Sequence, residues 1–314
     1  MMLPASPISS IHESPVPDRQ KDTTLMSTVE TVSEQTVKTA PVNLRPIDRV
    51  RLARDSQRPG TLHYIAELFT NFVELHGDRT FGDDGALIGG LATFNNQSVL
   101  VLGHQGGSNT RENLARNFGM PRPEGFRKAR RLMRHADKFR LPIVTFIDTS
   151  GADPGIGSEE RGQGTAIAES LLEMIGVRVP IICVVIGEGG SGGALAISLG
   201  DRLLMLENAV YAVASPEACA AILWKDASFA GEAADTMRVT AADLQRFGII
   251  DELIAEPVPA HEAPRETISA VGERVSAHLD ELLSRFDMSD PESMGLLLQE
   301  RYAKFRKIGA WHEG

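Results

Sequence analysis

The sequence predicts an α/β protein built around a largely parallel sheet. Apolar residues dominate residues 142–148 and fill residues 181–186, as in strands that are buried on both faces. Each of these runs is followed by a glycine-rich turn and then by a segment with helical spacing. Repeated strand–helix–strand units of this kind build layered α/β folds with right-handed crossovers.

The sequence becomes foldable from about Pro46. Apolar residues at helical spacing predict a helix over residues 61–75, capped near Thr61. Residues 86–94 and 98–102 are rich in types that favour strands. The Asn95-Asn96 pair between them predicts a hairpin turn.

The central elements alternate between helix and strand. A helix is predicted over residues 121–140, before the strand at 142–148, and a second over residues 158–176, before the strand at 181–186. The apolar stripe of the first helix consists of Phe126, Ala129, Met133 and Ala136.

The later elements are shorter. Residues 203–206 and 210–213 predict two short strands, and Ser215-Pro216-Glu217 predicts the start of a helix. Beyond Pro257 the chain is charged and helical to its end.

Composition divides the chain into three regions. Residues 1–45 are rich in Ser, Thr, Pro, Glu and Val without an apolar period, so we expect disorder there. They lack the features of a signal peptide, and Met26 is a second candidate for the start codon. Residues 46–257 form the predicted α/β domain, and residues 258–314 form a helical extension.

Charge and cysteine usage limit the function classes. The net charge of −10 argues against general nucleic-acid binding, and no apolar run of about 18 residues predicts a membrane span. Cys183 lies in an apolar strand and Cys219 beside alanines, which is typical of unpaired thiols in a reducing compartment. We therefore expect a cytoplasmic protein. No cluster has the spacing of metal ligands, so no metal site is predicted.

Two glycine-rich turns follow the two central strands. Residues 148–155 read DTSGADPG and residues 187–193 read GEGGSGG. Ligands bind beyond the carboxyl ends of parallel strands, so the two turns are predicted to face one site. We interpret the second turn as an oxyanion hole, in which glycines let a substrate oxygen approach unpaired N–H groups at a helix N-terminus.

The second turn also fits a dinucleotide-binding pattern. Gly187, Gly189 and Gly192 match G-x-G-x-x-G, and Glu207 is a candidate ribose ligand. Against this reading, the helix that follows is short, because Gly200 ends it.

A hydrolase is a further alternative. Gly189, Ser191 and Gly193 match the G-x-S-x-G pattern of a nucleophile elbow. Asp201 and His261 follow in the order that such a triad needs, but His261 lies in a segment rich in Pro and Ala.

Basic residues concentrate on the helix at 121–140. Arg127 and Arg131 are candidates for binding a phosphate-bearing substrate, and a solvated helix face is the alternative. His104 and Gln105 follow a predicted strand, where they either polarise a ligand or serve as structural hydrogen-bonding groups.

At these residues the sequence closely resembles the acetyl-CoA carboxylase carboxyltransferase α subunits of the bacterial and plastid type. The resemblance runs from about Arg45 to Ile254. The matching stretches are GHQGG from Gly103, RNFGMPRPEGFRKARRLM from Arg116, FIDTSGADPG from Phe146, EERGQG from Glu159, VIGEGGSGGALAI from Val185 and SPEACAAILWKDAS from Ser215.

The resemblance implies a fold, a reaction and partners. The implied fold is the crotonase-type β-β-α superhelix. The implied reaction moves a carboxyl group from carboxybiotin to acetyl-CoA and gives malonyl-CoA for fatty acid synthesis. The implied partners are a zinc-bearing β subunit in an α2β2 assembly, the biotin carboxyl carrier protein, and the ATP-using biotin carboxylase of the holo-complex. Biotin and acetyl-CoA are then substrates, and no covalently bound cofactor is expected in this chain.

The resemblance also implies site residues. The oxyanion glycines of the family correspond to Gly192 and Gly193, and the wider superfamily places a second donor at Gly151 or Ala152. The chain departs from the family pattern at two positions. Ser150 stands where proline is common, and Gly106 stands where lysine is common, which removes a cation from that position.

No acid–base pair, nucleophile or metal is evident in the two turns, and backbone donors suffice for this reaction. A crotonase-fold hydratase or isomerase is the nearest alternative. It needs a carboxylate pair, for which Asp153 and Glu188 are the candidates. A non-catalytic scaffold is the remaining alternative, and it would tolerate side chains at Gly192 and Gly193.

Overall fold

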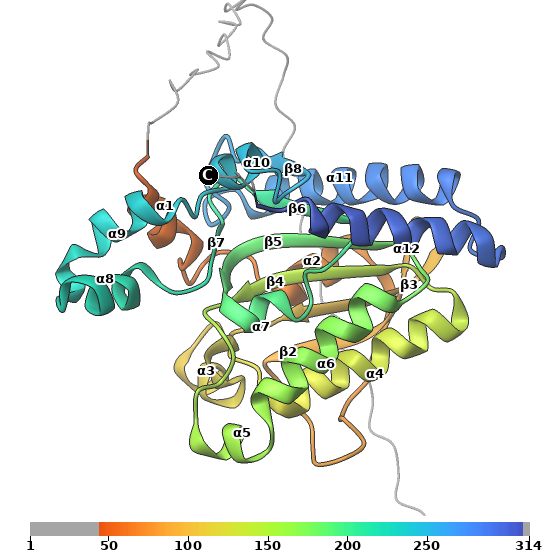
Figure 1. Cartoon of the computed structure of the whole chain (residues 1–314), viewed down its shortest axis with the longest axis horizontal. Helices are drawn as coiled ribbons and strands as arrows, with labels where there is room; N and C mark the ends of the chain where they lie inside the picture. The colour runs from red at the N-terminus through yellow and green to blue at the C-terminus, as the bar shows by residue number, and fades with distance from the viewer. Residues whose placement is uncertain (1–43, 310–314) are drawn as a thin grey trace, which may run out of the picture. The chain divides into compact units, whose positions relative to one another are not determined.

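The computed structural model describes residues 44–309. The disorder predicted for residues 1–45 and the start-codon hypothesis for Met26 therefore fall, apart from residues 44 and 45, outside the described residues. Within them, eight strands form one sheet in the order β1-β2-β3-β4-β5-β6-β8, and β7 pairs with β5 (Figure 1). The strands are β1 (Thr70–Glu74), β2 (Leu87–Phe94), β3 (Gln97–His104), β4 (Ile143–Thr149), β5 (Ile181–Gly190), β6 (Arg202–Leu206), β7 (Val210–Ala212) and β8 (Glu252–Ile254).

Helices cover the sheet. They are α1 (Pro46–Ala53), α2 (Thr61–Leu68), α3 (Thr110–Ala115), α4 (Pro123–Phe139), α5 (Ile156–Glu160), α6 (Gln163–Gly176), α7 (Ser191–Leu195), α8 (Pro216–Trp224), α9 (Ala230–Met237), α10 (Ala241–Arg246), α11 (Pro264–Arg285) and α12 (Pro291–Arg306). In Figure 1, α4 and α6 lie side by side in front of the sheet, and α4 packs on β2 and β3.

The sheet is antiparallel at one edge and parallel in its centre. β1, β2 and β3 pair antiparallel, and β3 to β6 pair parallel in chain order. Asn95 and Asn96 join β2 to β3 with φ angles of 46° and 64°, as in a type I′ turn, which confirms the predicted hairpin. The parallel pairing brings the carboxyl ends of β3, β4 and β5 to one edge of the sheet.

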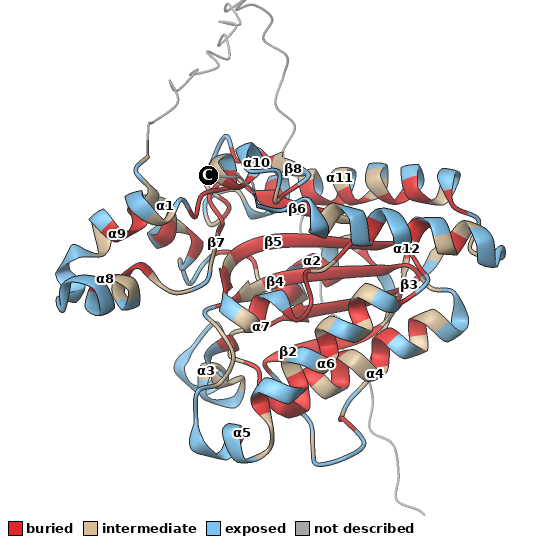
Figure 2. Ribbon diagram, viewed as in Figure 1, coloured by how far each residue is buried: buried red, intermediate tan, exposed pale blue. Residues whose placement is uncertain are grey.

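The core lies between the central strands and their helices. Nine of the ten residues of β5 are buried, which explains its unbroken apolar run (Figure 2). The predicted stripe of α4 is fully buried as well, and burial of each large apolar side chain contributes about 1.5–3 kcal/mol. The residues of that stripe are Phe126, Ala129, Met133 and Ala136.

The helix predicted over residues 61–75 is wrong beyond its first half. α2 ends at Leu68, and the chain continues as β1, which pairs with β2. Gly90 of β2 makes this pairing possible, because a Cβ there would lie 2.3 Å from the carbonyl oxygen of Val73. Phe72 and Val73 favour an extended strand, so pairing with β2 overrides their helical spacing.

Two further boundaries differ from the prediction. The helix predicted over residues 158–176 is split into α5 and α6 at Gly162, whose φ is 81°. The glycine-rich turn predicted from Gly187 starts later, because β5 continues to Gly190. The helix after it, α7, has only five residues.

The C-terminal helices α11 and α12 confirm the predicted helical extension. Their apolar faces join the same hydrophobic core as the sheet, through residues such as Val271, Leu279 and Leu297. None of the described helices is long and apolar enough to cross a membrane. Cys183 and Cys219 are both unpaired; Cys183 is buried, whereas Cys219 is half-buried.

Candidate functional site

The glycine-rich loops after β4 and β5 touch each other through their backbones. A Cβ on Gly193 would lie 2.6 Å from both the nitrogen of Ala152 and the carbonyl carbon of Gly151. A Cβ on Gly190 would lie 2.1 Å from the carbonyl oxygen of Ser150. Side chains cannot be accommodated at such distances, so glycine is required at both positions. The close contact fixes the two loops relative to one another at the carboxyl ends of the strands.

Ser191 gives the second loop its shape. Its φ of 52° is left-handed, a conformation that costs a residue other than glycine roughly 1–2 kcal/mol. Strain of this order is concentrated at functional sites. A left-handed residue followed by a right-handed one turns successive N–H groups toward one side, which forms a concavity suited to an anion.

The N–H groups of Gly192 and Gly193 belong to the first turn of α7, directly after Ser191. First-turn N–H groups have no partner inside their own helix, and within residues 44–309 no side chain or loop carbonyl accepts from either glycine. In the other loop, the N–H of Gly151 donates to Oγ1 of Thr149 at 3.1 Å. The candidate donor Gly151 is therefore already occupied, and Ala152 is the remaining candidate there.

The dipole of α7 contributes less to anion binding than the sequence predicts. A large dipole needs several aligned turns, and α7 is only five residues long. The donors of this site are therefore loop amides whose direction is set by Ser191 and by the contact between the loops.

His104 and Gln105 end β3 beside the two loops, and both have structural roles. The ring of His104 is fully buried, and its two nitrogen atoms are hydrogen-bonded to the backbone of Asp148 in β4 and of Gly193 in α7. The amide of Gln105 accepts from the N–H of Leu62 at 2.8 Å and donates to the carbonyl of Gly106 at 2.7 Å. Neither side chain is available to polarise a ligand.

Asp148 is a residue of this site that sequence reasoning did not single out. The register between β4 and β5 shifts there, and its Oδ1 accepts from the N–H of Glu188 at 3.0 Å. Gly187 leaves room for this carboxylate, because a Cβ on Gly187 would lie 2.2 Å from Oδ1. Burial raises the pKa of Asp148 to about 6. A shift of register at a strand end, which the sequence does not reveal, gives Asp148 its place.

The basic residues of α4 are held by acceptors of the same chain. Nε of Arg127 lies 2.7 Å from Asp78, and Nε of Arg131 donates to the carbonyl of Gly77 at 3.1 Å. Nζ of Lys128 lies 2.6 Å from Asp83. Salt bridges offset the charges of Arg127 and Lys128, and Arg131 is held by a backbone carbonyl, so this geometry does not support a role in substrate binding for Arg127 and Arg131.

Comparison with known proteins decides the family. The sequence profile of the acetyl co-enzyme A carboxylase carboxyltransferase-like family matches residues 7–309. The acetyl-coenzyme A carboxylase carboxyl transferase subunit alpha of Bacillus subtilis is 55% identical over 85% of this chain and 80% of the relative. That of Prochlorococcus marinus is 53% identical over 86% of this chain and 79% of the relative.

The chain belongs to this family.

Solved structures confirm the fold of this carboxyltransferase. Transcarboxylase 12S with bound methylmalonyl-coenzyme A superposes with a TM-score of 0.56 at 20% identity, covering 71% of this chain and 43% of that one. A Pseudomonas malonate decarboxylase hetero-tetramer with coenzyme A gives 0.54 at 18% identity, over 72% and 90% of the two chains. The crotonase-type fold implied by the resemblance is confirmed.

The carboxylate pair that a hydratase or isomerase requires is absent from the described site. Glu188 forms an ion pair with Arg54 at 2.7 Å. Asp153 accepts from the hydroxyl of Ser158 and lies 3.8 Å from Arg122. Each carboxylate is thus held by its own partner, and the hydrogen bond to Ser158 keeps the pKa of Asp153 below its usual value despite the opposing effect of burial. The carboxyltransferase is favoured over this alternative.

The dinucleotide alternative does not fit the loop geometry. Gly187 and Gly189 belong to β5 and make room for Asp148 and for the ring of Tyr211, not for a pyrophosphate. Glu207 lies 3.3 Å from Arg49.

The hydrolase triad does not form either. Asp201 lies beside Ile181 at the start of β5, and Ser191 follows its end, a separation of about 30 Å for ten extended residues. The ring of His261 lies 3.5 Å from Glu262, the residue next to it in the chain. Ser191 is therefore far from the acid that the expected triad requires.

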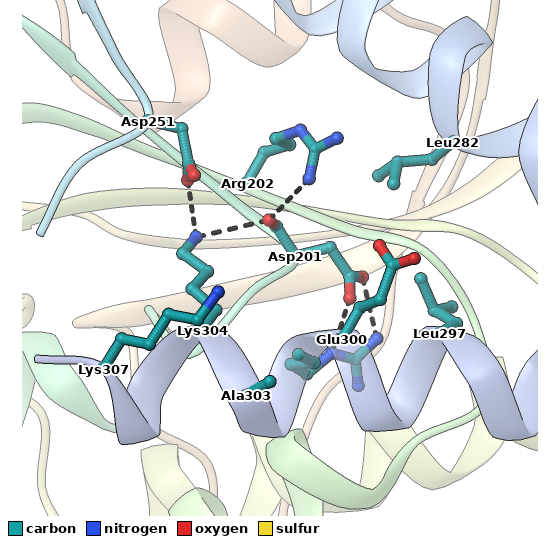
Figure 3. Close-up of a pocket in the computed structure, with 10 residues that line it drawn as sticks. Asp201, Arg202, Asp251, Leu282, Leu297, Glu300, Ala303, Lys304 and Lys307 are labelled. Carbon is teal, nitrogen blue, oxygen red and sulfur yellow. Dashed lines mark hydrogen bonds and ion pairs between the residues drawn. The ribbon is translucent and has the colours of Figure 1, made fainter. Parts of the chain in front are cut away.

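A hollow of about 320 Å³ lies near the amino ends of β6 and β8, where α12 packs against the sheet (Figure 3). Its central charges are paired: Arg301 with Asp201 at 2.7 Å, and Lys304 with Asp251 at 2.5 Å. These pairs dock α12 onto the sheet, and the hollow is separate from the glycine loops.

Proposed function

We propose that this carboxyltransferase chain is the α subunit that, with a β subunit, transfers a carboxyl group from carboxybiotin to acetyl-CoA. The family and the names of its relatives support the reaction. The single structural observation that carries the proposal is the fixed backbone contact between the loops at Gly193 and Gly151–Ala152. It presents unpaired amides of glycines at the strand edge where ligands bind in α/β sheets.

The proposed chemistry needs anion stabilisation more than it needs an acid or a base. Carboxybiotin loses CO2 and leaves a ureido anion. That anion takes a proton from the methyl group of acetyl-CoA, and the enolate attacks CO2 to give malonyl-CoA. Both anions carry their charge on an oxygen atom. A backbone donor aimed at such an oxygen contributes about 2.7–4 kcal/mol to transition-state stabilisation.

We assign the N–H groups of Gly192 and Gly193 to the ureido oxygen of biotin, with Ala152 as the second-loop candidate. The β subunit then supplies the donors for the thioester enolate. On this assignment the active site is divided between two chains. The proposed assembly is α2β2 with zinc in the β subunit, served by a biotin carboxyl carrier protein and a biotin carboxylase.

Reconstitution tests this proposal. The purified chain is expected to form no malonyl-CoA alone, and to form it after mixing with a β subunit in the presence of acetyl-CoA and carboxybiotin. The reverse reaction, loss of the carboxyl group of malonyl-CoA to free biotin derivatives, provides a second readout. Activity of the isolated chain, or a complex that assembles but is inactive in both directions, would contradict it.

A further inference from the structure

We propose that His104 is a positioning residue that orients the Gly192–Gly193 peptide for binding an oxyanion. This inference rests on the function proposed above. His104 is the last residue of β3, and its side chain is 0% exposed. Its ring is hydrogen-bonded to the backbone of Asp148, near the end of β4, and to the backbone of Gly193, in α7.

The carbonyl of Gly193 lacks its usual helical partner. In a regular α-helix it would accept from the N–H of Ile197, four residues further on. Just beyond the end of α7, the N–H of Ile197 donates instead to the carbonyl of Ala194, three residues back, at 3.3 Å. The chain thus leaves the α-helix through a tighter, 3₁₀-type turn. Nε2 of His104 lies 3.2 Å from the oxygen of Gly193 and takes the place of the missing donor.

The second ring nitrogen completes the arrangement. Nδ1 of His104 accepts from the N–H of Asp148 at 3.4 Å, beyond the end of the β3–β4 ladder. One nitrogen donates and the other accepts, which assigns the neutral tautomer with its proton on Nε2. Burial lowers the pKa of His104 to about 4, so this tautomer persists at neutral pH. Because backbone groups occupy both nitrogens, His104 acts through Gly193 and not on the substrate.

Gly193 is consequently held on two sides. Its α-carbon lies against the Gly151–Ala152 peptide, and its carbonyl is fixed by His104. The His104 contact fixes the Gly193–Ala194 peptide directly. Because the α-carbon of Gly193 is held against the other loop, this contact also restrains the plane of the preceding peptide, which carries the N–H of Gly193. Loss of the His104 contact frees this plane to rotate, and a misplacement of about 1 Å in an active site costs on the order of 100-fold in rate.

Two substitutions separate the two hydrogen bonds of the ring. In His104→Gln the side-chain amide reaches the position of Nε2 and retains the bond to Gly193. In His104→Asn it reaches only the position of Nδ1 and loses that bond. In the complex with the β subunit, we expect His104→Asn to lower kcat for malonyl-CoA formation on the order of 100-fold with an unchanged KM for acetyl-CoA. His104→Gln is expected to restore most of the loss.

Thr145→Val is the matched control. Oγ1 of Thr145 is buried and donates at 2.8 Å to the carbonyl of Ile197, just beyond α7. This variant also removes a buried donor from the same region, but it leaves the Gly193 carbonyl bonded. We expect a lowered melting temperature, because a buried hydrogen bond is lost. We expect kcat to stay within about twofold of the wild type, because this bond does not hold the Gly193 peptide.

Three outcomes would overturn the inference while the wild-type complex is active. These are equal kcat values for His104→Asn and His104→Gln, a loss in His104→Asn no larger than that in Thr145→Val, or an increase in KM alone.

NMR of the wild-type chain with 15N-labelled histidine gives a test that needs no variant. It is expected to show His104 as the Nε2–H tautomer, and an Nδ1–H tautomer would contradict the inference. An inactive wild-type complex would instead contradict the proposed function.

Discussion

Gly193→Ala is expected to lower malonyl-CoA formation by the complex with the β subunit about 100- to 1,000-fold. The added methyl would lie 2.6 Å from two backbone atoms of the Gly151–Ala152 peptide. Neither atom belongs to a flexible side chain, so the two loops must separate and the Gly193 N–H must turn. The measurement is kcat for malonyl-CoA formation, together with the stoichiometry of the purified complex.

Gly164→Ala provides the control for this variant. Gly164 lies in α6, and nothing lies within 4 Å of a Cβ built there. Alanine at this position is expected to leave activity unchanged and to stabilise the helix slightly. A Gly193→Ala complex that assembles normally and retains the wild-type kcat would contradict the assignment of the site.

Arg301→Met is expected to destabilise the protein by about 3–5 kcal/mol, because it leaves a buried carboxylate without its partner. Nε and one terminal nitrogen of Arg301 donate to Asp201 at 2.8 and 2.7 Å. Its remaining donors satisfy three carbonyl oxygens near the end of α6. Thermal unfolding of the full chain should show a melting temperature lowered by about 10 °C.

Arg306→Met is the control for general effects of replacing an arginine by methionine. Arg306 is exposed near the end of the same helix, so we expect the melting temperature to change little. Adding Asp201→Asn to Arg301→Met should recover part of the loss, because the neutral amide no longer leaves a charge unpaired. If the melting temperature of Arg301→Met lies within 2 °C of the wild type, the loss in free energy of unfolding is about 1 kcal/mol or less. That result would show that the Arg301–Asp201 pair does not anchor α12.

Apolar patterning predicted the elements that lie wholly in the core, and it misled at the edge of the sheet. The unbroken run in β5 and the stripe of α4 correspond to burial, which patterning reports directly. At Phe72 the helical spacing was coincidental. The conformation of this segment is set by its pairing with β2, in which Val73 lies opposite Leu91 and Glu74 opposite Gly90. No local pattern contains that information.

The candidate site was predictable in its glycines but not in its supporting residues. Gly192 and Gly193 stood out because several glycines cluster after a buried strand. Asp148 and His104 matter through a register shift and a narrowed helix end, which arise only when β3, β4 and β5 are assembled. Conversely, the charge of Arg127 suggested a ligand, whereas the fold supplies Asp78 as its partner.

The most direct test of the oxyanion hole at Gly193 removes one backbone donor and changes no side chain. Incorporation of glycolic acid at position 193 replaces the Gly192–Gly193 amide by an ester and so deletes the N–H. The same substitution at position 164, another first-turn N–H, is the matched control. We expect the ester at 193 to lower kcat of the complex about 100- to 1,000-fold and the ester at 164 to leave it unchanged. Wild-type kcat with the ester at 193 would contradict the claim that this amide stabilises an oxyanion.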